Sequence, residues 1–195
     1  MSTAQYGMVI DLRSCTGCQT CVISCKTANE VPEEGFWSHV VDYYEGETYI
    51  ASEVDGQWTH DSYAYYVSVS CNHCANPVCV AACPTGAMHK SEETGIVSVD
   101  QDICIGCNTC GNTCPYEIPV LQEERCVMGK CNLCAGRLDQ GKDPFCVQAC
   151  PTRIRKVGLI SDPESEVSKL IAEHNAQPYK PENDTSPSVY YILPQ

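Results

Sequence analysis

Apolar and polar residues alternate over only short stretches of this chain, so the strands that they predict are short. Residues 86–90 and 96–100 have the pattern of two short strands, and the polar run Glu92-Glu93-Thr94-Gly95 between them has the composition of a turn. The pattern therefore predicts a β-hairpin over residues 86–100.

Residues 26–70 form a second region of short strands. Residues 40–44 and 48–52 predict strands about a turn at Gly46, and Asp55-Gly56 is a further hairpin signal. The region is rich in aromatic residues, namely Phe36, Trp37, Tyr43, Tyr44, Tyr49, Trp58, Tyr63, Tyr65 and Tyr66. Such side chains suit either an interface with a partner or a cover that excludes water from a site beneath it.

The C-terminal residues 161–195 predict one helix and a tail. Asp162 is placed to cap the helix, with Pro163 at its first position. Three apolar residues then fall on one helical face, namely Val167, Leu170 and Ile171. From residue 177 onward four prolines predict an extended tail that either wraps a partner or is mobile.

No apolar run in the chain approaches the roughly 20 residues needed to span a bilayer, which predicts no direct membrane insertion.

Cysteine is the unusual feature of the composition, with 17 in 195 residues. Such a density is typical of disulfide-rich secreted proteins. Residues 1–14 nevertheless lack a basic segment, an apolar segment, a twin arginine and a cleavage site. We therefore expect folding in the cytoplasm, where clustered thiols bind metal. The final location stays open between the cytoplasm, the membrane surface and export together with a partner.

The net charge of −13 limits the choice of partners. A surface of this sign argues against nucleic acid and against direct contact with anionic membranes.

Sixteen of the cysteines fall into four groups of four. These are Cys15, Cys18, Cys21 and Cys25; Cys71, Cys74, Cys79 and Cys83; Cys104, Cys107, Cys110 and Cys114; and Cys131, Cys134, Cys146 and Cys150. The first and third have the C-x2-C-x2-C-x3-C spacing of bacterial ferredoxins, in which three cysteines bind one 4Fe–4S cluster and the fourth reaches the next. Gly17 and Gly106 allow the sharp turns that such wrapping requires. The groups therefore predict four 4Fe–4S clusters.

Other cysteine sites fit the spacing less well. Zinc sites use two separated C-x2-C pairs without a third cysteine three residues on. A radical S-adenosylmethionine site needs C-x3-C-x2-C, which is missing, and a Rieske centre needs two histidines. His73 is accordingly expected either beside a cluster or at the surface. The seventeenth cysteine, Cys126, is expected to be a small buried apolar residue, with exchange of ligands as the alternative.

The residues beside the cysteine groups repeat as well. An aspartate stands four residues before the first cysteine in groups one and three, and Cys83-Pro84-Thr85 matches Cys150-Pro151-Thr152 in groups two and four. The repeat favours an inner ferredoxin-like unit at 71–125, in which Cys83 and Cys114 are exchanged between two clusters. An outer unit, 1–25 with 126–160, would exchange Cys25 and Cys150. Spacing alone does not exclude pairing of the third group with the fourth.

The predicted fold class is thus α+β. It consists of two nested bacterial-ferredoxin-like units, made of short β-hairpins and cluster-binding loops, with the inserted region 26–70 and the C-terminal helix and tail. We expect little conventional core, because bound clusters replace buried apolar area in such small units, and we expect the iron-free chain not to fold.

Several segments also match a known family beyond their cysteines. They are Gln5-Tyr6-Gly7, Cys15-Thr16-Gly17-Cys18, Cys25-Lys26, Ser70-Cys71-Asn72-His73-Cys74, Cys83-Pro84, Gly86-Ala87-Met88-His89-Lys90, Cys104-Ile105-Gly106-Cys107 and Cys114-Pro115-Tyr116. In these segments the chain resembles the iron–sulfur subunit of dimethyl sulfoxide reductase, over about residues 5–160. The insertion and the tail match loosely.

The resemblance implies a subunit without chemistry of its own. Such subunits pass single electrons between a quinol-oxidising membrane anchor and a catalytic subunit with a molybdopterin cofactor, and the catalytic partner carries the export signal. The family pattern would place the clusters in a row. From the catalytic subunit outward, their ligands would be Cys15, Cys18, Cys21 and Cys150; Cys131, Cys134, Cys146 and Cys25; Cys71, Cys74, Cys79 and Cys114; and Cys104, Cys107, Cys110 and Cys83.

Two details complete this interpretation. Nitrate reductase relatives have tryptophan in place of the cysteine at position 107 and hold a 3Fe–4S cluster there, so Cys107 predicts a 4Fe–4S cluster. The alternatives to a complex subunit are a free-standing polyferredoxin, which the long insertion and tail disfavour, and a zinc-bound structural module. The substrate of the complex is not encoded in a subunit that only carries electrons.

Overall fold

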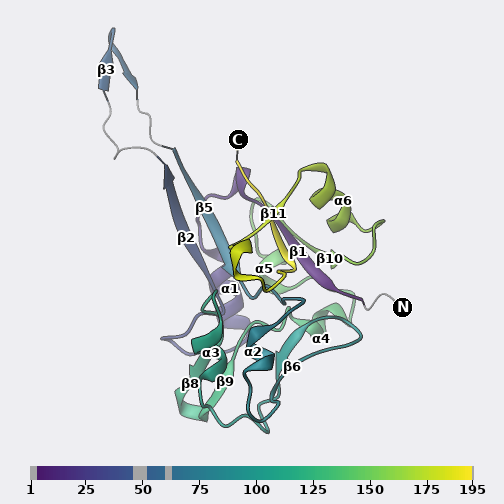
Figure 1. Ribbon diagram of the computed structural model, residues 1–195. Helices are drawn as coiled ribbons and strands as arrows, with labels where there is room; N and C mark the ends of the chain where they lie inside the picture. Colours follow the sequence, from purple (N-terminus) through teal and green to yellow (C-terminus); the bar gives the residue numbers. More distant parts are fainter. Residues whose placement is uncertain (1–3, 46–51, 60–62, 195) are drawn as a thin grey trace.

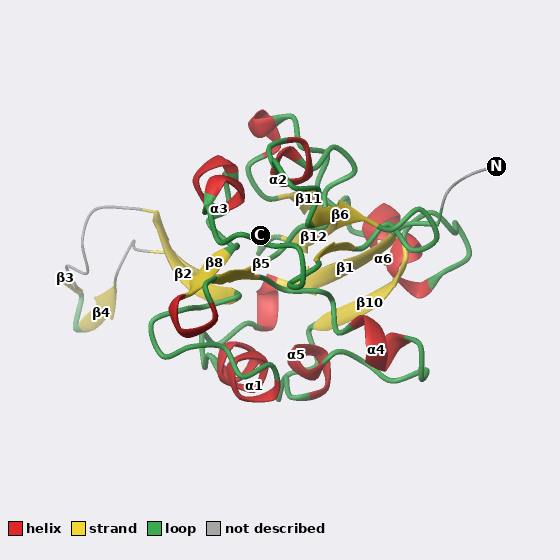
Figure 2. Cartoon of the chain, turned by 90° about the horizontal axis from the view of Figure 1, so that it is seen from below, coloured by secondary structure: helices red, strands yellow, loops and turns green. Residues whose placement is uncertain are grey.

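The computed structural model describes residues 4–45, 52–59 and 63–194. In chain order its helices and strands are β1 (Tyr6–Asp11), α1 (Thr20–Ala28), β2 (Ser38–Glu45), β3 (Ser52–Val54), β4 (Gln57–Thr59), β5 (Tyr63–Ser70), α2 (Val78–Ala81), β6 (Met88–Lys90), β7 (Val97–Val99), α3 (Thr109–Thr113), β8 (Val120–Gln122), β9 (Val127–Gly129), α4 (Ala135–Leu138), α5 (Phe145–Gln148), β10 (Arg155–Leu159), α6 (Glu166–Glu173), β11 (Gln177–Pro178) and β12 (Val189–Ile192). The structure is therefore mixed α and β, with short helices surrounding small sheets (Figure 2). No helix in the described ranges is both long and apolar enough to cross a bilayer.

The largest sheet has the strand order β10-β1-β12-β11. Strand β1 lies at its centre, antiparallel to β10 and parallel to β12. Met8 and Ile10 enter the main core on one face of β1, while Val9 packs on the other face with residues of α6. Because both faces are covered, β1 is a continuous apolar run rather than an alternating one.

The C-terminal tail belongs to this sheet. Residues 189–192 form β12, in which Val189 and Tyr191 are almost completely buried. The Tyr191 hydroxyl donates a hydrogen bond to the Ser68 carbonyl oxygen at 3.1 Å. The expectation of a tail that is mobile or wraps a partner is therefore wrong for these residues, because an apolar, aromatic-rich segment is better buried in the chain's own sheet.

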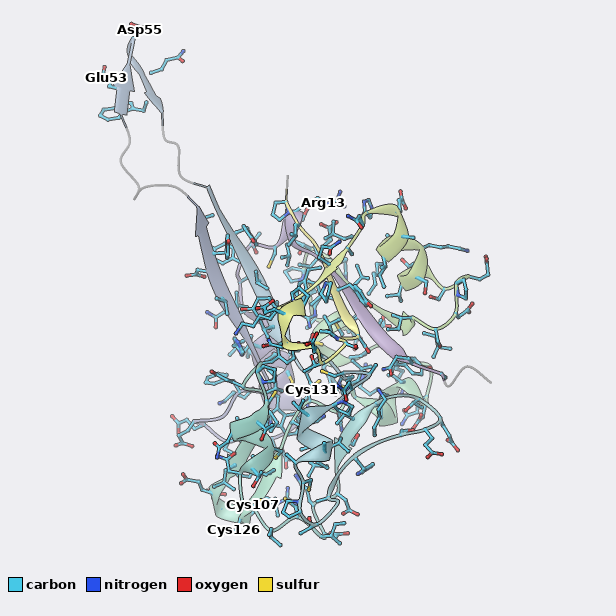
Figure 3. The ribbon with its side chains drawn as sticks, in the orientation of Figure 1. Arg13, Glu53, Asp55, Cys107, Cys126 and Cys131 are labelled. Atoms are coloured by element: carbon cyan, nitrogen blue, oxygen red, sulfur yellow. The ribbon has the colours of Figure 1, made fainter. Side chains whose placement is uncertain are left out.

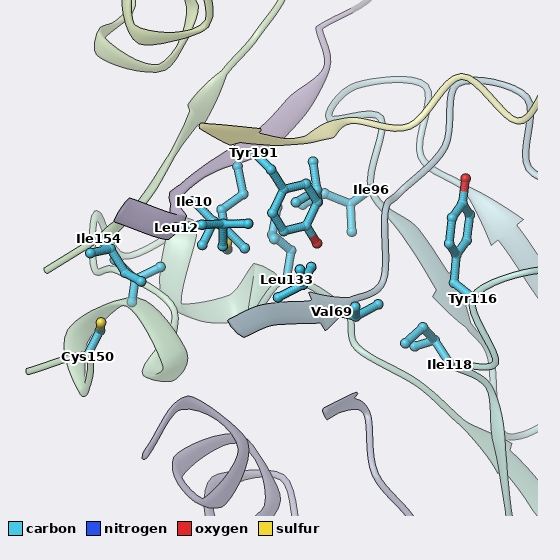
Figure 4. Packing of buried hydrophobic residues seen from close by; sticks show 14 residues of the cluster. Ile10, Leu12, Val69, Ile96, Tyr116, Ile118, Leu133, Cys150, Ile154 and Tyr191 are labelled. Atoms are coloured by element: carbon cyan, nitrogen blue, oxygen red, sulfur yellow. The ribbon is translucent and has the colours of Figure 1, made fainter. Parts of the chain in front are cut away.

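The apolar core is also larger than expected. Fourteen buried residues from distant parts of the chain form one cluster (Figure 4), namely Met8, Ile10, Leu12, Val67, Val69, Ile96, Tyr116, Ile118, Leu133, Val147, Cys150, Ile154, Val189 and Tyr191. Strands β1, β5 and β12 supply much of it, and several cysteines pack at its edge. The prediction of little conventional core is wrong, because β5 and β12 both contribute to it and neither strand is among those predicted.

The predicted hairpins are correct in two places. Strands β6 and β7 pair antiparallel around the acidic turn, as expected. Strands β3 and β4 pair around Asp55-Gly56, both with positive φ, which is the conformation this dipeptide favours. Strand β2, however, pairs with β5, so that Val41 lies opposite Val67. The predicted partner at 48–52 is wrong at Ser52, which belongs to β3; the rest of that segment and the turn at Gly46 lie outside the described residues.

Together, strands β2 to β5 form a long arm that projects from the body (Figure 1). Its base packs into the core through Val67 and Val69. Farther out, the rings of Tyr43 and Tyr65 contact each other with centroids 4.7 Å apart. Trp58 near the tip is 72% exposed.

Helix α6 has the predicted apolar face but begins later than expected. Val167 is buried against β1, and Leu170 and Ile171 pack beside it. The cap is Ser165, whose Oγ accepts a hydrogen bond from the Ser168 N–H at 3.1 Å. Asp162 instead accepts one from the Glu164 N–H at 2.9 Å and closes a turn before the helix. Both residues are good caps, so the sequence alone does not decide between them.

This cap provides a test of the packing of α6. Replacing Ser165 by alanine is expected to cost about 1 kcal/mol, because it removes the cap of the first turn. For a domain of this size we expect the melting temperature of the iron-loaded protein to fall by about 2–4 °C, as measured by circular dichroism. Ser165→Thr keeps the capping hydroxyl, which also donates to the Leu159 carbonyl oxygen at 2.7 Å, and should behave like the unaltered protein. An equal loss in both variants would contradict the role of the cap.

Candidate metal centres

Each of four cavities is lined by four cysteines, and all seventeen thiols are free of disulfides. We number these cavities as sites 1 to 4. Their cysteines are Cys15, Cys18, Cys21 and Cys150 in site 1; Cys25, Cys131, Cys134 and Cys146 in site 2; Cys71, Cys74, Cys79 and Cys114 in site 3; and Cys83, Cys104, Cys107 and Cys110 in site 4. In each site one cysteine comes from a different group in the sequence than the other three.

The exchange between sites 1 and 2 follows from helix geometry. Cys21 and Cys25 lie four residues apart on α1, one helical turn, and line site 1 and site 2 respectively. Cys146 on α5 lines site 2, and Cys150, four residues on, lines site 1. Helices α1 and α5 pack side by side, so α1 carries one thiol to each cavity, as does the segment formed by α5 and the two residues after it.

Helices α2 and α3 repeat this arrangement at sites 3 and 4. Cys79 lies on α2 and lines site 3, while Cys83 just after the helix lines site 4. Cys110 on α3 lines site 4, and Cys114 at its end lines site 3. These two helices also pack together. The four sites therefore form two pairs, each joined by two short helices.

The loops that enter sites 1 and 4 depend on glycine. Gly17 and Gly106 have φ values of +66° and +65°, which favour glycine. A Cβ on Gly17 would lie 2.6 Å from the ring of Tyr66. A Cβ on Gly106 would overlap the carbonyl oxygen of Cys126. The cysteines on either side can thus follow the cavity wall only while these positions have no side chain.

A comparison of alanine variants at Gly106 and Gly86 distinguishes the cost of an unfavourable backbone conformation from the cost of a steric overlap. Both have positive φ, but a Cβ on Gly86 would meet no atom within 4 Å. Gly86→Ala should cost about 1–2 kcal/mol for its conformation alone, whereas Gly106→Ala should cost more and lower the iron bound at site 4. Melting temperature and iron content of the two purified variants are the measurements. Equal melting temperatures and iron contents in the two variants would show that the overlap between the added Cβ and the Cys126 carbonyl oxygen is relieved at no cost.

Burial differs strongly among the sixteen thiols. Cys18 and Cys107 are exposed, whereas Cys25 and Cys150 are buried. Burial raises the pKa of Cys25 to about 12, and like charges from Cys146 and Cys134 add to this effect. Burial likewise raises the pKa of Cys79 to about 12. Metal binding at sites 2 and 3 must therefore displace protons, and it becomes more favourable as the pH rises.

Hydrogen-bond donors surround the sulfur atoms. The N–H groups of Met88 and Met128 donate to Cys83 and Cys104 at 3.3 Å. A threonine also stands two residues after Cys18 in site 1 and two residues after Cys107 in site 4, and its hydroxyl oxygen lies 3.3 Å from the cysteine sulfur in both places. The same C-x-T pattern follows Cys83 and Cys150, at 3.7 Å and 3.6 Å. In the sequence two of these threonines stand out as part of a repeat, but their contacts with sulfur are visible only in the structure. A metal-bound thiolate has no proton, so toward such a sulfur the hydroxyl is the donor.

These features fit iron–sulfur clusters. Four thiols and several donors to sulfur meet at each cavity, which is the ligand set of a 4Fe–4S cluster. In the described ranges no three His, Cys, Asp or Glu side chains converge closely enough to hold a single metal ion. The thiols are instead spread around the walls of a cavity.

Comparison with known proteins agrees with this chemistry. The model of the 4Fe–4S dicluster domain matches residues 62–160, half of the chain. The protein belongs to the 4Fe–4S dicluster family. It is 42% identical to a component of the anaerobic dimethyl sulfoxide reductase of Escherichia coli, over 87% of this chain and 81% of that protein. It is 37% identical to a component of the tetrathionate reductase of Salmonella typhimurium, over 96% of this chain and 72% of that protein. It is 34% identical to the arsenate respiratory reductase iron–sulfur subunit of a Shewanella strain, over 96% of each chain.

The family segment contains sites 3 and 4 completely. It contains three of the four cysteines of site 2 and Cys150 of site 1. The first group, Cys15 to Cys25, lies before it. The remaining cysteines of sites 1 and 2 thus come from the segment between β1 and the end of α1, which the longer alignments with relatives also cover.

His73 lies outside the four sets of cysteines but next to them. His73 is buried, not at the surface, and its Nε2 lies 3.7 Å from the Cys131 sulfur. Its Nδ1 accepts a hydrogen bond from the Val97 N–H at 3.1 Å, so the proton is on Nε2 and points to the sulfur. Burial lowers the pKa of His73, which keeps the ring neutral. His73 therefore occupies the first of its two predicted places, beside a cluster site.

Cys126 is exposed, so the prediction of a buried apolar residue is wrong. Its backbone has a φ of +51°, and its Sγ contacts the Glu123 carbonyl oxygen at 3.3 Å. It lines none of the four cavities, although it lies at the same end of the molecule as Cys107 (Figure 3). Its position at the end of a short 3-10 helix turns the side chain outward.

Two aromatic residues of the insertion cover sites, so one of the two expectations holds, and an interface with a partner stays a prediction. Trp37 is buried and lines site 2, and Tyr66 covers the Gly17 loop at site 1. Phe36 and Trp58 are exposed, and the Lys26 ammonium lies 4.1 Å from the centre of the Phe36 ring. The base of the insertion therefore covers sites 1 and 2, and the arm carries exposed aromatic rings outward.

Proposed function

We propose that this protein is the iron–sulfur electron-transfer subunit of a molybdenum reductase complex, with one 4Fe–4S cluster in each of its four sites. The observation that carries the proposal is the set of four cysteine-lined cavities joined in pairs by α1 with α5 and α2 with α3. The relatives are named as components of dimethyl sulfoxide, tetrathionate and arsenate reductases, which supports the same role here.

A bound 4Fe–4S cluster gains and loses one electron at a time, and the residues of this chain set where that happens. At each of the four short helices, the cysteines that serve two sites follow each other by one helical turn, so sites 1 and 2 are neighbours, as are sites 3 and 4. Sites 2 and 3 adjoin where His73 lies between Cys131 and Cys71. The sites therefore follow one another in a row from 1 to 4, and the exposed thiols Cys18 and Cys107 belong to its two ends.

The partners follow from the two ends of this row. We infer that site 1 faces a catalytic subunit with a molybdopterin cofactor, and that site 4 faces the electron donor or acceptor at the other end, such as a membrane-anchor subunit. The protein supplies no catalytic residue of its own in this scheme. The projecting arm and its exposed Trp58 favour a subunit of a complex over a free-standing polyferredoxin.

Anaerobic purification from the native host tests the proposal. We expect about sixteen irons per chain, broad visible absorbance and a co-purifying subunit that contains molybdenum. Zinc in place of iron would contradict the cluster assignment. An iron-loaded protein that elutes as a monomer at its native abundance would favour the free-standing polyferredoxin, and a partner without molybdenum would contradict the type of complex.

A further inference from the structure

Arg155 is a buried charge without an ionic partner. The residue is 2% exposed and is the largest of the fully buried side chains. Its Nη1 donates a hydrogen bond to Ser68 Oγ at 2.7 Å, and its Nη2 lies 3.3 Å from Met8 Sδ. Its Nε has no partner, and none of the ion pairs in the described residues includes it. A buried guanidinium is costly unless nearby negative charge compensates for it.

The position of Arg155 suggests where that negative charge would be. The side chain lines site 1, and it interacts electrostatically with Cys21 of the same site. It also interacts with Cys146 and Cys131, which belong to site 2. Burial alone would lower the pKa of Arg155, but these thiols raise it above the ordinary value, so the charge is retained. The guanidinium therefore lies between the two sites, because it lines site 1 and contacts the sulfur of Met8, which lines site 2.

Ser68 connects the guanidinium to one sulfur atom. Its Oγ accepts the hydrogen bond from Arg155 and lies 3.3 Å from the sulfur of Cys21. A metal-bound thiolate has no proton, so the hydroxyl must donate to the sulfur. Because the oxygen already accepts from a cation, its own proton is the more strongly polarised. Ser68 lies at the base of the arm on β5 and is 1% exposed.

We propose that Arg155, acting directly on both sites and through Ser68 on Cys21, raises the reduction potentials of the clusters in sites 1 and 2. This inference rests on the proposed function, because it requires clusters in these sites. Reduction adds a negative charge to a cavity, and a fixed positive charge in a poorly solvated interior stabilises that charge. A donor to ligand sulfur acts in the same direction. Sites 3 and 4 lie farther along the row and receive less of this effect.

Three variants of the holo-complex and one control separate charge from packing. Arg155→Gln removes the charge, Arg155→Lys keeps it, and Ser68→Ala removes the link to Cys21. The control is Lys156→Gln, which removes the same formal charge from the next residue of β10, where the lysine is half-exposed and pairs with Glu166 at 3.1 Å. Iron content is measured first, followed by a redox titration monitored by electron paramagnetic resonance.

For Arg155→Gln we expect about a tenfold lower ratio of reduced to oxidised cluster at a fixed potential in sites 1 and 2, equivalent to about 59 mV for one electron. In Arg155→Lys the reduction potentials should fall by less than in Arg155→Gln. In Ser68→Ala the potential of site 1 alone should fall, and in the control the potentials of all four sites should stay unchanged. Arg155→Gln with full iron and unchanged potentials would overturn the inference, as would an equal shift of all four sites. If that variant does not assemble, an unchanged site 1 in Ser68→Ala overturns it. Absence of clusters from the unaltered protein would instead contradict the proposed function.

Discussion

Replacing Cys146 by serine is expected to remove the cluster from site 2 and to interrupt electron transfer through the protein. Cys146 lines site 2 from α5, and the proposed path of the electrons passes through this site. Loss of one of four thiolate ligands should lower the iron content from about sixteen to about twelve per chain. Changes beside metal ligands already cost about 10–100-fold in activity, so removal of a ligand should cost the complex at least about 100-fold.

The natural control for this prediction is Cys126→Ser. Cys126 is exposed and lines none of the four cysteine-lined cavities, so its replacement should leave both iron content and turnover unchanged. Iron is measured by elemental analysis, and turnover is measured in the complex with an artificial electron donor. Full activity in Cys146→Ser with only about twelve irons would mean that electrons bypass site 2.

Removal of iron is expected to have the largest effect on stability. Six cysteines pack at the edge of the main core, namely Cys15, Cys71, Cys74, Cys114, Cys131 and Cys146. Without metal their sites become cavities beside that core, and the loops that carry them lose their strongest bonds. We expect the iron-free protein to show no cooperative transition on heating, although its core is larger than the sequence predicts.

Differential scanning calorimetry before and after anaerobic chelation is the measurement for this second prediction. Reconstitution with iron and sulfide should restore the transition, which would distinguish loss of metal from irreversible damage. A cooperative transition in the iron-free sample would show that the sheet around β1 and its core suffice for folding.

The features that could be predicted from the sequence are those encoded locally. The cysteine sets that line the four cavities are the sets expected from spacing and flanking residues, because one helical turn separates the third and fourth cysteines of every group. The hairpins at residues 88–99 and at Asp55-Gly56 depend on turn residues and were likewise predictable. That these thiols bind iron stays a prediction.

The features that could not be predicted depend on contacts between distant residues. The parallel pairing of β1 with β12 joins the two ends of the chain, and no local pattern specifies it. Arg155 does not stand out in the sequence because arginine is ordinarily exposed, and its burial results from the sheet and the two sites that surround it. The sequence near α6 offers two good caps, Asp162 and Ser165, and does not decide between them. It likewise does not show whether the side chain of Cys126 points inward or outward.

The position of β1 has a consequence for the order in which the protein is made. Its sheet neighbours are β10 and β12, so β1 has no sheet partner until residues 155–159 have been synthesised, and its second partner follows with residues 189–192. All cysteines of sites 3 and 4 are synthesised by residue 114, whereas sites 1 and 2 wait for Cys150 and Cys146. During synthesis the cysteine sets of sites 3 and 4 are therefore complete first, and those of sites 1 and 2 are complete only once residue 150 has been made.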